Sequence, residues 1–132
     1  MKTTTIWKSG QAFDSSFKNA KIEVDGQAGF SPKALLLSGL AACSGIDVVE
    51  VLEKMRVPFA DLKIEVEADQ TEEHPRVFKD IHMIYIIKTE EANRDKVKKA
   101  IDLSLDKYCG VAAMLKKNSK ILYTITIQPD SF

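Results

Sequence analysis

The sequence predicts an α+β fold with helices packed on one side of a sheet. Two segments, 62–69 and 121–128, alternate apolar and polar residues as half-buried strands do. Two longer segments, 34–55 and 90–118, have helical patterns. A chain of 132 residues fits one domain, here taken as residues 1–132. Because two helices cannot cover both faces of such a sheet, we expect them on one face.

The N-terminal part is predicted to be a meander of short strands. Aromatic and β-branched residues recur through residues 2–25, and turn-forming dipeptides interrupt them at Ser9-Gly10 and Asp25-Gly26. Ser31 followed by Pro32 is typical of a helix start, where serine caps the helix and proline takes its first position.

The helix predicted over residues 34–55 is apolar almost all round in its first half. Charged residues appear only later, from Asp47 onward, and Pro58 ends any continuation. Such a helix belongs in the centre of a structure or in an interface. It has more apolar surface than one protomer of this size can hide, so we expect a homodimer that shares this helix.

The C-terminal half is predicted to contain a hairpin, a second helix and a last strand. The strands 62–69 and 77–88 are joined by a polar link and should pair with each other. Residues 90–118 place apolar side chains on one face of a helix and lysines and aspartates on the other. Residues 121–128 complete the order.

Composition and charge exclude several classes of function. The 19 basic residues balance the 19 acidic residues, so no overall field attracts nucleic acid or an acidic membrane. No stretch has the length of a signal peptide or an uninterrupted membrane span, which predicts a cytoplasmic protein. Two histidines, His74 and His82, without a ligand cluster beside them predict no metal site, and no cofactor is expected.

Two cysteines, Cys43 and Cys109, are the candidate functional residues. They lie far apart in the sequence, so neither a CxxC motif nor a zinc-ribbon spacing is present. Each is expected within a helix and is followed closely by glycine, which helices disfavour by about 1 kcal/mol. Small residues would let two helices approach closely enough for a disulfide. The alternative from the residues alone is a pair of inert buried thiols.

The local sequence does not supply a group that would ionise Cys43. Asp47 and Glu50 follow it on the same helix and oppose a negative sulfur. A cation would have to come from elsewhere, with Lys33 and Arg76 as candidates. Cys109, near Asp106, is better suited to reacting with a sulfenic acid formed on the other cysteine than to starting the reaction.

Several segments together resemble the OsmC/Ohr family of osmotically inducible and organic hydroperoxide resistance proteins, and most closely its YhfA-like branch. The resemblance covers residue 31 to the end of the chain. The segments that carry it are Ser31-Pro32, Ala41-Ala42-Cys43-Ser44-Gly45-Ile46-Asp47-Val48-Val49, Glu72-Glu73-His74-Pro75-Arg76-Val77-Phe78 and Ala100-Ile101-Asp102-Leu103-Ser104 leading into Lys107-Tyr108-Cys109-Gly110-Val111-Ala112-Ala113-Met114-Leu115.

The resemblance implies a fold of antiparallel sheets with two long central helices, in an intertwined homodimer with active sites at the subunit interface. It also implies roles for both cysteines. Cys43 would be the peroxidatic residue that attacks an organic or lipid hydroperoxide, and Cys109 would resolve its sulfenic acid as a disulfide. A dithiol, such as a lipoylated protein, would then reduce the disulfide.

The chain departs from the peroxidases of this family at two positions. Those proteins activate the first cysteine with an arginine from the N-terminal meander and a glutamate shortly before the cysteine. Here no arginine precedes Arg56, and Lys33 and Ala34 stand near the glutamate position. Lysine is a poor substitute for the planar guanidinium. The alternative function is therefore a non-catalytic, small-molecule-binding or redox-sensing dimer.

The aromatic residues of the N-terminal part have two possible uses. They could line an apolar pocket for an alkyl chain, or they could belong to the core or the dimer interface. These residues are Trp7, Phe13, Phe17 and Phe30.

Overall fold

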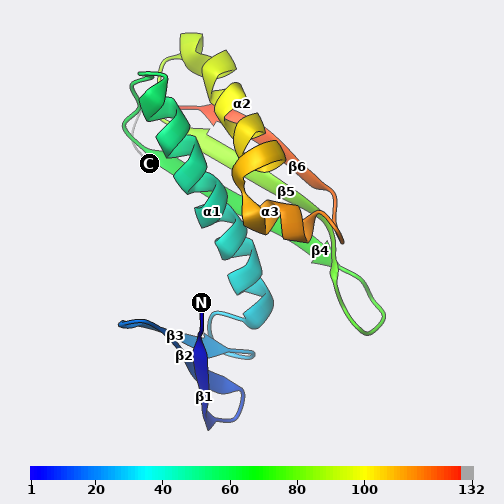
Figure 1. The fold of residues 1–132 in the computed structure, drawn as a ribbon. Coiled ribbons are helices and arrows are strands. Elements are labelled where there is room, and N and C mark those ends of the chain that lie inside the picture. The colour runs from blue at the N-terminus through cyan, green and yellow to red at the C-terminus, as the bar shows by residue number, and fades with distance from the viewer. Residues whose placement is uncertain (129–132) are drawn as a thin grey trace. The chain divides into compact units, whose positions relative to one another are not determined.

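The computed structural model describes residues 1–128 (Figure 1). The chain divides into two compact units, of which the first is Met1–Ser38 and the second begins at Gly39. The α+β class is confirmed, with two three-stranded sheets and helices. The single domain over residues 1–132 stays a prediction.

The first unit contains the predicted meander. Its strands β1 (Thr4–Ser9), β2 (Ala12–Phe17) and β3 (Ala20–Asp25) form one antiparallel sheet in sequence order. Val24 is the one buried residue of this unit. A sheet with so little buried surface cannot be stable in isolation, because burial of apolar area is what offsets the ordering of the chain.

The helix α1 (Pro32–Lys54) begins where the sequence predicts. The hydroxyl oxygen of Ser31 accepts a hydrogen bond from the backbone N–H of Ala34 at 3.2 Å, which is the geometry of an N-cap. The helix is long and apolar enough to cross a membrane by length and composition alone. Its buried residues, however, follow one another every four positions, which is the spacing of a core-facing stripe. They are Leu40, Ser44, Val48 and Leu52.

The second unit contains the other sheet. Strands β4 (Leu62–Gln70) and β5 (Phe78–Ile87) pair antiparallel as the predicted hairpin. The last strand β6 (Ile121–Ile127) pairs with β5 in parallel. The expectation of antiparallel sheets is therefore wrong for this one pairing. The chain between β5 and β6 is a helical crossover, which returns β6 to the end of the sheet at which β5 began.

One face of this sheet carries the helices, as predicted. Figure 1 shows α1 and α2 lying across the same side of β4, β5 and β6. Alternate residues of β5 point into this layer and are buried. The largest of them, Tyr85, is fully buried and meets the ring of Tyr123 edge-on at a centroid distance of 6.0 Å.

The predicted second helix is not continuous. A short 3-10 turn η1 (Glu91–Asn93) leads into α2 (Arg94–Leu103), and a wide π turn η2 (Ser104–Tyr108) follows. A separate short helix, α3 (Gly110–Leu115), begins after Cys109. The prediction of one helix over residues 90–118 is wrong, since the backbone leaves the helical conformation at Cys109.

Candidate functional site

Cys43 lies in the middle of α1 and is partly exposed. Gly45, two residues later, faces the sheet rather than another helix. A methyl group there would come 3.2 Å from the terminal methyl carbon of Ile64 in β4. Around Gly110, by contrast, a methyl group would meet nothing within 4 Å. The interpretation that both glycines allow two helices to approach each other is wrong. Gly45 allows α1 to approach β4.

Cys109 lies at the break between η2 and α3. Its backbone is extended, with φ −78° and ψ 104°, and its sulfur accepts a hydrogen bond from the N–H of Ala112 at 3.3 Å. Cys109 therefore caps the start of α3 instead of lying within a helix. The residue is only 3% exposed, so solvent hardly reaches its thiol.

The fold places the two cysteines near each other. Both are free thiols, and the thiol of Cys43 is one of the groups that raise the pKa of Cys109. Burial raises the pKa of Cys109 to about 11, and the hydrogen bond from Ala112 partly opposes this shift. The Cys43 thiol and the charge of Asp47 add to the increase. Cys109 therefore keeps its proton at neutral pH.

A chain of buried hydroxyl groups lies beside the thiols. The Tyr85 hydroxyl is 2.6 Å from the Ser44 hydroxyl, which is 2.9 Å from the hydroxyl of Ser104. The Ser104 hydroxyl also donates to Asp47 Oδ2 at 2.9 Å. These bonds satisfy polar groups whose burial without partners would cost about 1–3 kcal/mol each. The chain thus ties β5, α1 and η2 together around the cysteine pair.

Tyr85 is the buried end of this chain. Burial raises the pKa of its phenol, although the hydrogen bond to Ser44 lowers it, and the charges of Cys109, Tyr123 and Asp47 raise it further. Tyr85 is therefore a neutral hydrogen-bonding group at any physiological pH. Because the charge of Cys109 acts on the phenol, the Tyr85 side chain lies near the Cys109 sulfur.

The sequence analysis missed the three hydroxyl residues of this chain. Ser44 and Ser104 stand where the helical pattern otherwise has buried apolar residues, and Tyr85 stands on the buried side of an alternating strand. A polar side chain on a core-facing position is a signal of a buried hydrogen bond. Asp47 was noted as opposing charge on Cys43, and in the structure its charge raises the pKa of Cys109.

A groove opens beside this cluster, between α1 and the α2–η2 segment. It has a volume of about 620 Å³, within the usual size of small-molecule sites. Asp47 lines it, as does Tyr108, the neighbour of Cys109. The other lining residues combine charged with apolar side chains and are Glu50, Val51, Lys54, Met55, Lys99 and Leu103.

The two candidate cations, Arg76 and Lys33, lie in different parts of the chain. Arg76 lies exposed in the link between β4 and β5, beside the cis peptide bond of His74-Pro75. Lys33 belongs to the first unit. Within residues 1–128, no group of three histidine, cysteine, aspartate or glutamate side chains is arranged to hold a metal ion.

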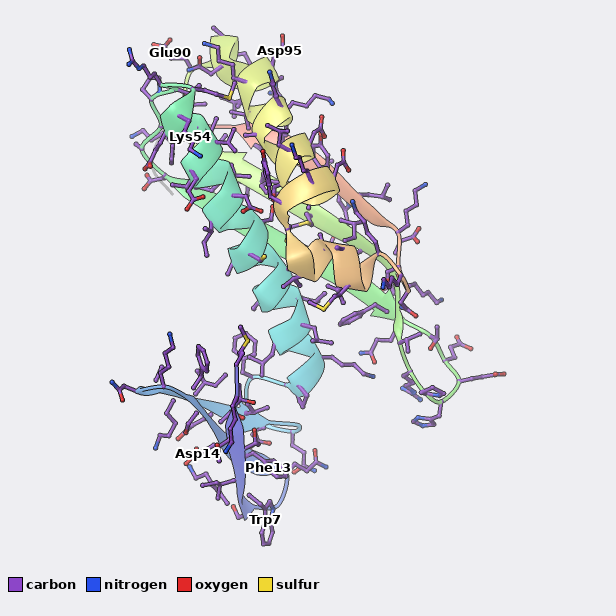
Figure 2. All side chains as sticks on the ribbon, viewed as in Figure 1. Trp7, Phe13, Asp14, Lys54, Glu90 and Asp95 are labelled. Atoms are coloured by element: carbon purple, nitrogen blue, oxygen red, sulfur yellow. The ribbon has the colours of Figure 1, made fainter. Side chains whose placement is uncertain are left out.

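The aromatic residues of the first unit are largely exposed. Trp7 is 63% exposed, and its indole N–H donates to the Gly10 carbonyl oxygen at 3.0 Å. Figure 2 shows Trp7 projecting from the strands of this unit. Phe17 and Phe30 are also exposed, so these residues do not form a core within the single chain.

Comparison with known proteins gives consistent matches over almost the whole chain. The family model "OsmC-like protein" matches residues 24–124. YhfA of Escherichia coli strain K12 is 33% identical over 131 residues, which cover 96% of this chain and 98% of YhfA.

Solved structures of similar fold include a hypothetical protein from Aquifex aeolicus, with 30% identity, a TM-score of 0.84 and 96% of each chain covered. The organic hydroperoxide resistance protein OhrB of Bacillus subtilis is 18% identical, with a TM-score of 0.71 over 95% of this chain and 96% of OhrB. At that identity, OhrB shows the fold alone.

Proposed function

This chain belongs to the OsmC-like protein family, and from that premise we propose that it is a thiol-dependent peroxidase for organic hydroperoxides. Family membership supports a peroxide-related redox role. The single observation that carries the finer proposal is that the two free thiols, Cys43 and Cys109, lie close enough for Cys43 to raise the pKa of Cys109. Two free thiols near each other, one partly exposed and one buried, are what a disulfide-forming reaction requires.

The proposed first step takes place at Cys43. Its sulfur, in the thiolate form, attacks the outer oxygen of the hydroperoxide, the O–O bond breaks, and the alkoxide leaves as an alcohol after taking a proton. Cys43 is oxidised to a sulfenic acid and the hydroperoxide is reduced. Cys43 suits this role because it is the more exposed of the two cysteines.

The proposed second step uses Cys109. Its sulfur attacks the sulfur of the Cys43 sulfenic acid, the S–S bond forms and the S–O bond breaks. The hydroxide that leaves takes up the proton of Cys109 and becomes water. A dithiol, for which a lipoylated protein is our proposal, then reduces the disulfide. Burial of Cys109 supports these roles, because a buried and protonated thiol does not attack the hydroperoxide and stays reduced until Cys43 is oxidised.

The groove lined by Asp47 and Tyr108 supports an organic substrate. Its apolar residues, among them Val51 and Leu103, provide contact for an alkyl or lipid chain. Its charged residues lie at positions that could hold a polar end group, with Lys54 and Lys99 as the cationic members.

We propose that the working unit is an intertwined homodimer in the cytoplasm. The first unit buries only Val24 within residues 1–38, so a second copy of the chain is the surface that would cover its strands. The stripe of buried residues along α1 supports assigning it as a core helix rather than a membrane span. We propose no nucleic-acid or membrane partner.

Titration of the reduced protein with tert-butyl hydroperoxide tests the proposed reaction. We expect loss of two thiols per chain and formation of the Cys43–Cys109 disulfide, measured by mass spectrometry. Cys43→Ser should consume no peroxide, whereas Cys109→Ser should accumulate a sulfenic acid that dimedone traps. Unchanged thiol counts in the wild-type protein at excess peroxide would refute the proposal.

A second candidate is a non-catalytic or redox-sensing dimer. The observation that favours it is that the charged side chain acting on Cys109 is the carboxylate of Asp47 rather than a cation. This candidate predicts slow alkylation of Cys43 by iodoacetamide at neutral pH, at the rate of an unactivated thiol. Alkylation much faster than that of a free cysteine would favour the peroxidase.

A further inference from the structure

Ser104 occupies an unusual position at the start of the π turn η2. The residue is fully buried, and its hydroxyl lies 2.9 Å from two groups on α1, the Ser44 hydroxyl and Asp47 Oδ2. A serine hydroxyl carries one proton, and the charged carboxylate is the stronger acceptor. Ser104 therefore fastens the turn to α1 on the same side of that helix that carries Cys43.

The main chain of the same residue holds Cys109. The carbonyl oxygen of Ser104 accepts the N–H of Cys109 at 2.7 Å, and this bond closes the wide turn. The side chain of Ser104 thus contacts the helix of one cysteine, and its backbone contacts the other cysteine.

The rest of the turn is also held in place. The ammonium group of Lys116 donates to the carbonyl oxygen of Leu105, and it pairs with Asp106 at 3.4 Å. Because hydrogen bonds hold η2 at both of its ends, the position of the Cys109 sulfur relative to Cys43 depends on how the Ser104 hydroxyl joins η2 to α1.

We propose that Ser104 is the positioning residue that holds the Cys109 thiol against Cys43, by fastening the π turn to Asp47 and Ser44 of α1. The inference rests on the proposed function for its purpose, since it concerns the resolving step. Its geometry can be tested without peroxide.

The test is a thiol–disulfide equilibrium in glutathione redox buffer. Oxidation of the two cysteines forms one S–S bond and reduces one glutathione disulfide to two glutathione thiols, so electrons and protons balance. The fraction of disulfide at each buffer ratio gives the effective concentration of one thiol at the other. Mass spectrometry after acid quenching measures that fraction.

Ser104→Ala should lower this effective concentration by about tenfold or more, equivalent to at least roughly 1.4 kcal/mol. Ser119→Ala is the matched control, because Ser119 is also a buried serine but its hydroxyl donates to the carbonyl of Phe78 at 3.1 Å. This control should leave the effective concentration unchanged. Equal values for both variants would overturn the proposal.

Two substitutions of Asp47 test the same hydrogen bond from the α1 side. They keep the proposal testable if Ser104→Ala does not fold. Asp47→Asn keeps an oxygen acceptor for the Ser104 hydroxyl and should retain most of the effective concentration, whereas Asp47→Ala should lower it as Ser104→Ala does. If the substitutions acted only by unfolding the protein, Asp47→Asn and Asp47→Ala would not differ in this way. Equal values for Asp47→Asn and Asp47→Ala would overturn the proposal, while failure of peroxide reduction would leave this measurement intact.

Discussion

At the scale of single residues, the two cysteines of this protein have different surroundings. Cys43 is partly exposed on α1, whereas Cys109 is buried and its sulfur accepts a hydrogen bond from the Ala112 N–H. Burial, rather than a single charged partner, is the main reason that Cys109 holds its proton. This difference in exposure favours the proposal that Cys43 reacts first and that Cys109 then forms the disulfide.

The Cys109 thiol makes stability depend on pH in the alkaline range. Its pKa is raised to about 11 from the 9.0 of an ordinary cysteine thiol, so the folded state binds the proton more tightly than the unfolded state. This contribution to stability is complete below pH 9 and is lost as pH rises through 11. We expect the stability difference between the wild-type protein and Cys109→Ala to shrink between pH 8 and 11, as measured by urea unfolding. A constant difference over that range would contradict the expectation.

Tyr85 contributes a buried hydrogen bond that can be removed by itself. Tyr85→Phe deletes only the hydroxyl that lies 2.6 Å from Ser44, and it should lower the free energy of unfolding by about 1 kcal/mol. Tyr108→Phe is the control, because the Tyr108 side chain is 53% exposed. Urea unfolding at one protein concentration measures both, and an equal effect would show that the buried bond contributes no net stability.

At the scale of elements, the segment from α2 to α3 determines the geometry of the site. In a continuous helix over residues 90–118, Cys109 would lie at a different position from the one that it occupies. The π turn η2 and the extended backbone of Cys109 instead change the direction of the chain. π turns inside helices often occur at functional sites, where the extra residue redirects a side chain. The same segment makes β6 parallel to β5.

The N-cap of α1 gives a prediction for a single element. Ser31→Ala removes the acceptor for the Ala34 N–H and should destabilise the protein by about 1 kcal/mol. Ser31→Asp keeps an acceptor and adds a negative charge at the positive end of the helix, so it should match the wild type or exceed it. Urea unfolding of the three proteins at equal concentration checks the order. Equal losses for alanine and aspartate would contradict the capping role.

At the scale of the whole molecule, apolar surface remains exposed in each unit. The first unit exposes Ile6, Trp7 and Ile22, and the second exposes Ile46 on α1 at 61%. Ile46 lies three residues after Cys43, so any chain that covers Ile46 also lies close to the Cys43 thiol. This placement is consistent with an active site that a second copy of the chain completes.

Ile46 therefore tests the proposed homodimer. Ile46→Glu places a charge in the proposed interface and should shift the protein towards monomer, as measured by analytical ultracentrifugation. Val77→Glu is the control, because Val77 is an exposed apolar residue in the link between β4 and β5. A variant Ile46→Glu that sediments like the wild type would place the interface elsewhere.

The sequence by itself determined what depends on local periodicity. The strands, the start of α1 at Ser31 and the two cysteines as candidate site residues all follow from patterns within a few residues. The family resemblance, carried by segments around both cysteines, is confirmed by the family match and by YhfA.

Only the tertiary structure decided how distant residues meet. The apolar pattern around Cys109 continues through the break, because residues on both sides of it pack on the same core, and so periodicity predicted a single helix. The parallel pairing of β6, the proximity of the two thiols and the hydroxyl chain from Tyr85 to Asp47 join residues tens of positions apart. Such contacts depend on how whole elements pack, and a local pattern records that a residue is buried but not against which partner.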